Sequence, residues 1–131
     1  MRDFETLALP IEPSVIAPDG TLGRILLKLD GGSFAHFTLP PGATSHAVEH
    51  RTVEEIWFFL SGRGEVWRRN AAGEASVAAL PGLSITIPLG TAFQFRALGD
   101  EPLVFVAVTM PPWPGDGEAF VVAGPWAAQL P

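Results

Sequence analysis

Glycine and proline interrupt this chain at short, nearly regular intervals. The 14 glycines and 13 prolines make up about a fifth of the 131 residues, against an average near 12% in globular proteins. Both residues are costly inside a helix, so long helices are not expected. Hydrophobic residues make up 47% of the chain, which is too much for a disordered protein. The sequence therefore predicts an all-β protein of many short strands joined by turns.

Apolar runs of strand length lie between these turn signals. Residues 24–29 and 33–39 flank Asp30, Gly31 and Gly32, which predict a hairpin whose glycines adopt positive φ angles. Further runs lie at residues 44–50, 55–60, 65–69, 75–80, 83–88, 92–98 and 103–110. Turns that recur about every 8 to 12 residues are typical of a β-sandwich or barrel.

Length, charge and composition limit the class of protein. A chain of 131 residues fits a single domain, residues 1–131. A net charge of −6 with eight Lys and Arg provides no basic surface for nucleic acid. Residues 1–20 lack the apolar block of a signal peptide, and no run has the length of a membrane span. Without cysteine there is no disulfide or thiolate chemistry. We expect a cytoplasmic protein with no nucleic-acid or membrane partner.

One stretch combines glycines and ionisable residues at a defined spacing. It contains Gly42, Val48, His50, Glu55 and Gly62. This spacing resembles the first signature motif of the cupins, in which the positions of Val48 and His50 are usually both His. The resemblance implies a single double-stranded β-helix (jelly-roll) cupin barrel over about residues 22–110, with irregular N- and C-terminal segments packed on it. It also implies that His50 and Glu55 point into the central pocket.

A second framework of glycine and proline resembles the second cupin motif. Gly82, Pro88 and Gly90 match it, and Phe93 stands where the motif usually has another His. By resemblance, a complete site would use three His and one Glu to bind iron, manganese, nickel or zinc. Only His50 and Glu55 occupy matched positions here, whereas a catalytic zinc usually has three protein ligands. We expect no tightly bound cofactor, with a divalent transition metal on His50 and Glu55 as the alternative.

His46 is one candidate for a third metal ligand, and Gln94 is another. Because side chains alternate along a strand, His46, Val48 and His50 would share one face. Residues four apart on a strand are about 13 Å apart, so His46 and His50 would reach one ion only across a bulge. Of the adjacent carboxylates, Glu55 has the spacing of the motif, and Glu54 is expected in solvent. His36 is expected at the surface or the barrel rim.

Residues 93–96 have two possible registers. If Phe93 and Phe95 point inward, they close the pocket with apolar surface. In the other register Gln94 and Arg96 point inward and make the pocket polar, and an inward Arg96 would favour an anionic ligand. The sequence leaves both registers open, although a surface position is expected for Arg96. The residues predicted to line the ligand pocket are His46, Val48, Trp57, Phe59, Phe93 and Gln94.

Three functions are compatible with these residues, and the sequence does not decide whether the protein is an enzyme. The first is a barrel that binds a small molecule without a tightly held metal. The second is a metal-dependent cupin enzyme, of dioxygenase or sugar isomerase type, that uses His50 and Glu55 with a non-standard ligand. The third is metal-free acid/base catalysis by His50 and Glu55, by resemblance to sugar-epimerase cupins. The resemblance also implies a homodimer, and residues 111–131 are expected to clamp the barrel.

Overall fold

The computed structural model describes residues 1–131 and contains strands, turns and loops but no helix. The strands are, in chain order, β1 (Val15–Ile16), β2 (Leu22–Leu29), β3 (Gly32–Leu39), β4 (Val48–His50), β5 (Glu54–Ser61), β6 (Arg63–Asn70), β7 (Gly73–Ala79), β8 (Ser84–Ile87), β9 (Ala92–Leu98), β10 (Leu103–Met110) and β11 (Ala119–Val121). The predicted all-β class is confirmed. The protein therefore has no helix that could cross a membrane.

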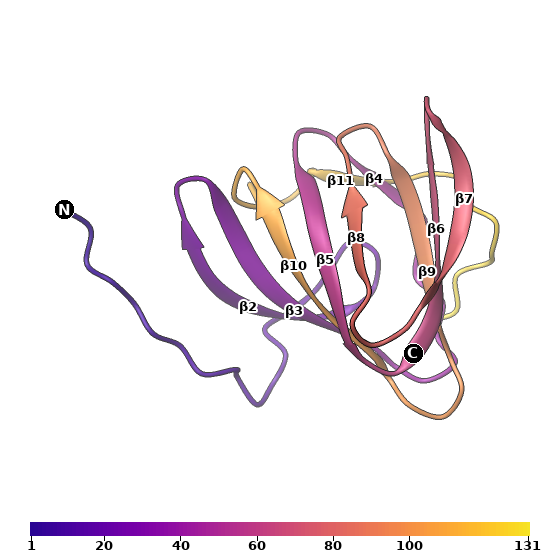
Figure 1. Cartoon of the computed structure of the whole chain (residues 1–131), viewed down its shortest axis with the longest axis horizontal. Helices are drawn as coiled ribbons and strands as arrows, with labels where there is room; N and C mark the ends of the chain where they lie inside the picture. The colour runs from indigo at the N-terminus through magenta and orange to yellow at the C-terminus, as the bar shows by residue number, and fades with distance from the viewer.

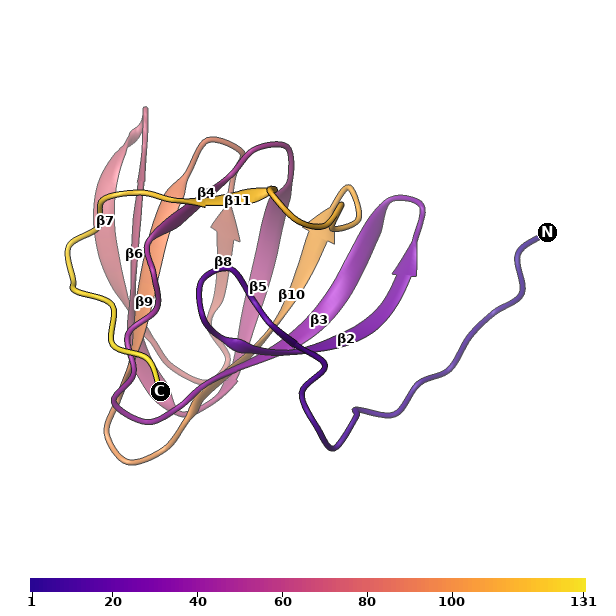
Figure 2. The ribbon, with the colours of Figure 1, turned by 180° about the vertical axis from the view of Figure 1, so that it is seen from behind.

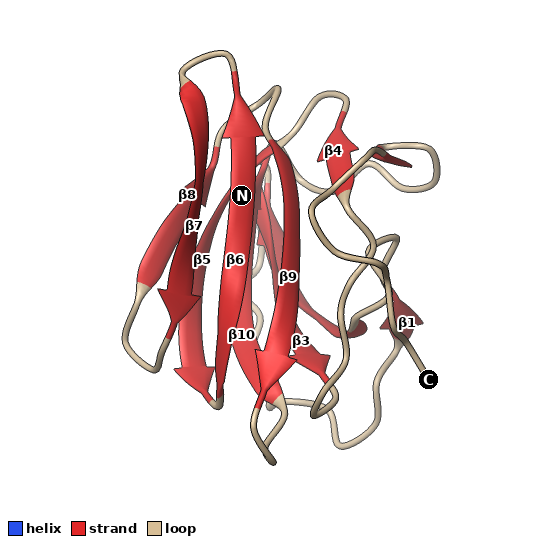
Figure 3. Ribbon diagram, turned by 90° about the vertical axis from the view of Figure 1, so that its right-hand side faces the viewer, coloured by secondary structure: helices blue, strands red, loops and turns tan.

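Two antiparallel sheets pack face to face and form the barrel (Figure 1). One sheet has the strand order β1-β2-β3-β10-β5-β8, and the other has the order β11-β4-β9-β6-β7. In Figure 3, which is turned by 90°, β6, β7 and β9 lie in front of β5 and β10. Strands that are neighbours in a sheet are often distant in sequence, as β3 and β10 are. This topology confirms the predicted jelly-roll barrel.

The core fills the space between the two sheets. On β5, Trp57 and Phe59 are buried while their neighbours Ile56 and Phe58 are exposed, as strand alternation predicts. The ring of Trp57 stacks on that of Phe105 from β10, with 4.3 Å between the ring centroids. Aromatic pairs of this kind stabilise a core by about 0.5–1.5 kcal/mol beyond the area they bury.

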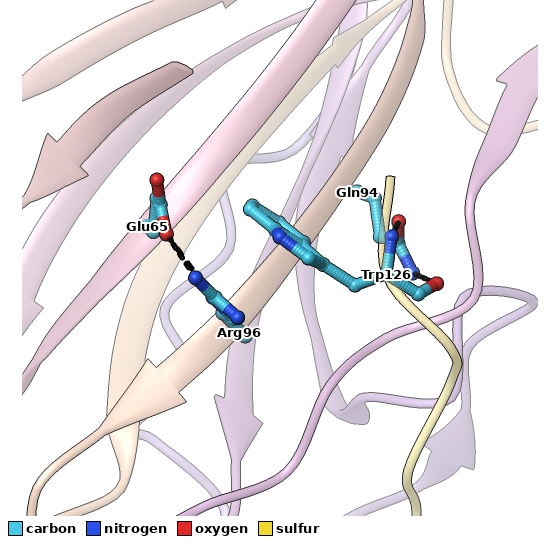
Figure 4. A network of polar contacts seen from close by, with 4 residues as sticks. All are labelled: Glu65, Gln94, Arg96 and Trp126. Atoms are coloured by element: carbon cyan, nitrogen blue, oxygen red, sulfur yellow. Dashed lines mark hydrogen bonds and ion pairs between the residues drawn. The ribbon is translucent and has the colours of Figure 1, made fainter. Parts of the chain in front are cut away.

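Strand β9 has the register in which Phe93 and Phe95 point into the core, where both are almost fully buried. Gln94 and Arg96 therefore point to the outer face, which the C-terminal segment covers. Gln94 exchanges hydrogen bonds with the backbone of Trp126, and the guanidinium of Arg96 lies over the Trp126 ring at 4.2 Å (Figure 4). Of the two registers that the sequence left open, the structure has the one with an apolar interior.

The C-terminal segment runs along the outside of the five-stranded sheet. Its strand β11 pairs with β4, and Thr44 forms an isolated bridge with Gln129 further along. The backbone of Val122 donates to the carbonyl of Ala47 at 2.9 Å. These contacts explain why Gln94, on the outer face of its sheet, is only 1% exposed.

Two details of the backbone differ from the predictions. Gly31 and Gly32 do not have positive φ angles, and Asp30 and Gly31 alone connect β2 to β3, with Leu29 paired to Gly32.

Gly62 does have a positive φ, of 77°, and a Cβ there would lie 2.1 Å from the carbonyl oxygen of Pro102. This position of the motif is thus closed to every other residue, both by its backbone angle and by the lack of space.

The predicted strand over residues 44–50 is regular only from Val48 to His50. Before it, the hydroxyl of Ser45 accepts a hydrogen bond from the backbone N–H of Phe95 at 3.0 Å. The backbone N–H of Ser45 donates to the Phe95 carbonyl at 2.9 Å. A side chain therefore replaces one backbone acceptor of the ladder, and the regular alternation expected for His46 does not apply.

The N-terminal segment extends away from the barrel before it forms β1 (Figures 1 and 2). Strand β1 pairs with β2. Ahead of β1, the guanidinium of Arg24 donates to the carbonyls of Pro10 and Ile11, both at 2.8 Å. Arg2 forms an ion pair with Asp30 at the tip of the β2–β3 hairpin. These contacts tie the segment to β2 at Arg24 and to the tip of the β2–β3 hairpin at Asp30.

Candidate functional site

A cavity of about 770 Å³ opens at the end of the barrel where β5 begins and β10 ends, which is the upper end in Figure 1. His50, Glu55 and Trp57 line it, together with Asp19 and Trp113 from segments outside the main strands. Its volume lies within the range of small-molecule sites. The cavity therefore brings together residues from the two ends of the chain and from the middle.

Glu55 points into this cavity from the start of β5 and is 7% exposed. Its Oε1 accepts a hydrogen bond from Trp57 Nε1 at 2.9 Å, and its Oε2 accepts one from Thr109 Oγ1 at 2.5 Å. Thr109 is the residue opposite Glu55 in the β5–β10 ladder. Burial raises the pKa of Glu55, and the two hydrogen bonds oppose that rise by stabilising the carboxylate. The carboxyl group is thus held in a fixed orientation.

His50 lies at the end of β4 and is also 7% exposed. The rings of Phe93 and Trp113 approach it edge-on, each with 5.2 Å between the ring centroids. Its Nδ1 is buried and has no hydrogen-bond partner. Burial lowers the pKa of His50, and the charges of Asp19 and Glu118 oppose this shift. A neutral imidazole is therefore favoured, and it has an unpaired nitrogen of a kind that is rare in protein interiors.

Asp19 is a cavity residue that the sequence analysis did not identify. Its Oδ1 accepts hydrogen bonds from the backbone N–H of Thr21 at 3.0 Å and from Thr21 Oγ1 at 2.6 Å. Burial raises the pKa of Asp19; the Thr21 hydrogen bonds and nearby His50 oppose the rise, and the charge of Glu55 adds to it. The Asp-Gly-Thr sequence predicts such a local turn. Only the folded chain places this turn beside His50.

The structure brings some of the predicted pocket residues together and separates others. Val48 and Trp57 line the cavity with His50 and Glu55. Phe59 and Phe93 lie deeper, in the core, where both pack against the Trp57 ring. These two residues shape the wall from behind and do not reach the open space.

His46 and Gln94 do not line the cavity, which corrects the prediction for both. The backbone N–H of His46 donates to the Asp19 carbonyl at 2.8 Å, in the irregular stretch before β4. Gln94 points outward, where its Nε2 donates to the carbonyls of Ser45 and Trp126 at 2.9 and 2.7 Å. The amide group of Gln94 is thus hydrogen-bonded to the C-terminal segment and is not available to a ligand.

Trp113 was predicted to lie in a structural clamp, and it also forms part of the cavity wall. Its backbone N–H donates to Ser33 Oγ at 2.9 Å, which fixes the proline-rich segment against β3. Thr109 and Phe105, which the sequence analysis did not select, line the cavity from β10. Strand alternation within 103–110 could have selected these two residues, since both share a face with buried Leu103.

The residues present do not fit the metal centre of a complete cupin site. Val48 and Phe93 replace two of the four usual ligands, and both are buried apolar side chains. Both candidates for a substitute ligand, His46 and Gln94, lie away from the cavity. The protein contains no group of three His, Cys, Asp or Glu residues arranged to hold a metal ion. These side chains therefore give no support to a metal-dependent reaction.

The sequence is similar to those of known cupins. The family model described as "Cupin domain" matches residues 35–109, which is more than half of the chain. A protein of Methanocaldococcus jannaschii, "Uncharacterized protein MJ1618", is 30% identical over 118 residues, which cover 86% of this chain and 90% of that protein. The family match spans the strands that carry His50 and Glu55.

Solved structures share the fold. CapF, a capsular polysaccharide assembling protein from Staphylococcus aureus, is 20% identical with a TM-score of 0.68, over 88% of this chain and 32% of CapF. The chain thus spans about a third of CapF. A Klebsiella pneumoniae protein with a double-stranded β-helix domain is 18% identical with a TM-score of 0.66, over 82% of this chain and 89% of its own. The fold, the motif spacing and the family match lead to one conclusion: the chain belongs to the cupin family.

Proposed function

We propose that this cupin binds a small organic molecule in its barrel cavity, without a tightly held metal. The observation that carries the proposal is the unpaired, buried Nδ1 of His50 in the wall of a cavity of about 770 Å³. A buried polar atom without a partner is costly. Since this nitrogen is closed to solvent, a ligand would supply the missing partner only after the imidazole ring turns toward the cavity, and would then remove that cost.

A ligand screen by thermal shift tests the proposal, because a molecule that binds only the folded state raises Tm. We expect hits that also change tryptophan fluorescence, since Trp57 and Trp113 line the cavity. The shift should be lost in His50→Ala and kept in His36→Ala, a matched control on β3 that does not line the cavity. Hits that bind both variants equally well would place binding elsewhere and contradict the proposal.

Metal-free acid/base catalysis is the second candidate, and one observation favours it. Burial lowers the pKa of His50 and raises that of Glu55, so a neutral base and a neutral acid are both favoured near the same pH. Such an enzyme should turn over a substrate in the presence of a chelator, and His50→Ala should abolish turnover. A pH profile that does not change in Glu55→Gln would contradict a catalytic role for that carboxyl.

Elemental analysis separates both candidates from the metal-dependent enzyme. After dialysis against mixed first-row metals, we expect much less than one equivalent of metal per chain, because only His50 and Glu55 are at matched positions. About one equivalent in the original protein and none in His50→Ala would contradict this expectation. That result would support the hypothesis of a metal-dependent enzyme, in which a third protein ligand moves into the cavity.

We also propose that two copies of the chain associate. The outer surface of the six-stranded sheet carries exposed Phe34, Ile56, Phe58 and Leu60. The N-terminal segment, with exposed Phe4, leaves a groove of about 670 Å³ beside the β2–β3 hairpin, and Phe34 lines that groove as well. In a two-fold pair, each copy covers the same surface of the other, so one contact buries both surfaces.

Light scattering after size exclusion tests this association. We expect a dimer in the original protein and a folded monomer in Phe58→Glu, which places a charge in the middle of the apolar surface. A monomer at every concentration of the original protein would contradict the proposal. The cytoplasmic location expected from the sequence stays a prediction.

A further inference from the structure

The charged groups around the cavity are mostly acidic. Glu5, Asp19, Glu55 and Asp116 line it, and Lys28 is the only Lys or Arg that does so. Lys28 is exposed on β2, where water screens its charge. Burial by contrast raises the pKa values of Asp19, which is half-buried, and of Glu55, so a counter-charge beside either group would favour its ionised form. A positively charged ligand would supply that counter-charge.

The hydrogen-bonding groups of the cavity indicate the same kind of ligand. The indole N–H of Trp57 and the hydroxyls of Thr21 and Thr109 already donate to the carboxyl groups of Asp19 and Glu55. Asp19 receives both of its hydrogen bonds on Oδ1, so Oδ2 has no protein donor. Among the groups that contact Asp19 and Glu55 the acceptors are in excess and the donors are used, whereas the indole N–H of Trp113, which also lines the cavity, donates to no protein group. A ligand rich in N–H donors therefore fits better than an anion.

His50 provides an independent observation that a ligand belongs here. Two histidines, His36 and His50, have a buried Nδ1 without a partner, and of these only His50, which is 7% exposed, lines the cavity. A neutral imidazole has one nitrogen that accepts a hydrogen bond. Placed beside Asp19 and Glu55, it adds an uncharged acceptor without adding positive charge that would repel a cation.

The remaining wall suits an organic cation better than a bare metal ion. No group of three ligands for a metal is present. Phe37 and Trp113, both half-buried, also line the cavity, and the Trp113 ring contacts that of His50. Aromatic rings attract ammonium groups through the negative charge density of their faces. A cavity of about 770 Å³ also has room for a carbon skeleton behind the charged group.

We propose that the cavity binds an organic ammonium ion, whose N–H groups donate to Asp19 Oδ2 and to the carboxylate of Glu55, with its carbon skeleton against Trp113 and Phe37. This inference rests on the proposed binding of a small molecule in the same cavity. It adds the chemical class of that molecule. It also assigns Asp19, from the N-terminal segment, as the residue that determines specificity for charge.

Three probes of similar size and different charge test the inference: 2-phenylethylamine, 2-phenylethanol and 3-phenylpropionate. Binding is measured by titration calorimetry at pH 7.5. We expect the amine to bind at least about tenfold more tightly than the alcohol, because its positive charge attracts the carboxylates and the neutral alcohol lacks that attraction. The carboxylate should bind most weakly. A carboxylate or alcohol that binds as tightly as the amine would overturn the inference.

Matched variants locate the charge effect. Asp19→Asn keeps an oxygen that can accept from Thr21, so the local turn should be preserved. In this variant we expect the preference for the amine over the alcohol to fall to about twofold or less. Asp100→Asn, an exposed residue that does not line the cavity, should keep the full preference. An unchanged preference in Asp19→Asn and in Glu55→Gln would overturn the assignment.

The two proposals fail in different ways. If neutral or anionic hits from the ligand screen bind in the cavity while the amine does not, small-molecule binding stands and the cation inference is wrong. If the amine binds and both His50→Ala and Asp19→Asn leave its affinity unchanged, binding is outside the cavity and both proposals are wrong. If neither the screen nor the three probes produce binding, both proposals are wrong.

Discussion

Two regions of the molecule place polar side chains next to tryptophan rings, and they differ in whether every buried polar side-chain atom is paired. Under the C-terminal segment, Gln94 makes three hydrogen bonds, and Arg96 pairs with Glu65 beneath the Trp126 ring (Figure 4). In the cavity, His50 has no hydrogen-bond partner at Nδ1. Paired polar groups hold a structure together, whereas unpaired ones are available to a ligand. The comparison therefore separates a structural region from a binding region.

The largest expected effect comes from removing the paired group. Gln94→Met keeps the length of the side chain and leaves Ser45 and Trp126 without their hydrogen-bond partners. We expect a loss of about 2–3 kcal/mol in the free energy of unfolding, because buried groups without partners are costly. Urea denaturation followed by tryptophan fluorescence measures it. Gln129→Met, at an exposed glutamine, serves as the control, and equal stabilities of the two variants would contradict the structural role.

Both carboxylate oxygens of Glu118 accept hydrogen bonds, whereas Asp19 accepts only through Oδ1, so the two carboxyl groups can be compared. The Glu118 carboxylate accepts hydrogen bonds from the backbone N–H groups of Thr52 and Val53 and from the Thr52 hydroxyl, and these lower its pKa although burial opposes the shift. Glu118→Gln should therefore lower the free energy of unfolding by about 1–2 kcal/mol at pH 7. Because the folded state favours the ionised form, this loss should disappear as the pH falls below 4.5 through the lowered pKa of Glu118. A loss that persists at low pH would contradict the explanation.

Asp19→Asn should change the free energy of unfolding at pH 7 in the opposite direction to Glu118→Gln. Burial raises the pKa of Asp19 above 3.8, so the folded state favours the neutral form and the original protein loses stability as the pH rises through that pKa. Without ligand, the variant should be more stable than the original protein at pH 7, with the difference vanishing below 3.8. Chemical denaturation at a series of pH values measures the difference. A variant that is less stable at pH 7 would mean that the Asp19 charge has a structural partner.

A smaller effect is expected from the ion pair at the edge of the paired region. Arg96 Nη2 lies 2.6 Å from Glu65 Oε1, with side chains 35% and 31% exposed. Partly exposed pairs contribute about 1 kcal/mol or less, because water screens the charges. Glu65→Gln should therefore change the unfolding free energy by less than about 1 kcal/mol. A change as large as that of Gln94→Met would show that the pair belongs to a cooperative network.

The smallest effect on stability is expected from the unpaired group. His50→Phe keeps an aromatic ring between Phe93 and Trp113 and removes the nitrogen that lacks a partner. We expect a change in unfolding free energy near zero or a small gain, together with loss of ligand binding. Denaturation and the ligand titration are run on the same preparation. A strong destabilisation would show that His50 is a structural residue and would remove the contrast between the two regions.

The sequence predicted the barrel well and the cavity in part. The all-β class and the cupin barrel follow from turn spacing and from the two motifs. His50 and Glu55 could be selected from spacing, and Val48 and Trp57 from alternation along their strands. Alternation alone could not exclude Gln94 from the pocket, because either register of β9 places an uninterrupted set of side chains inward. Packing of Phe93 and Phe95 against Trp57 decides between them.

By itself the sequence determined where the chain turns, which runs form strands, and that two of the usual metal ligands are replaced by Val48 and Phe93. These are local properties, since they depend on residue type and spacing along one strand or turn. Only the tertiary structure decided that Asp19 and Trp113 line the same cavity as His50. It also decided that the C-terminal segment forms hydrogen bonds with the side chain of Gln94. Those contacts join residues that are far apart in sequence, and they form because the two sheets and the terminal segments must cover a common core.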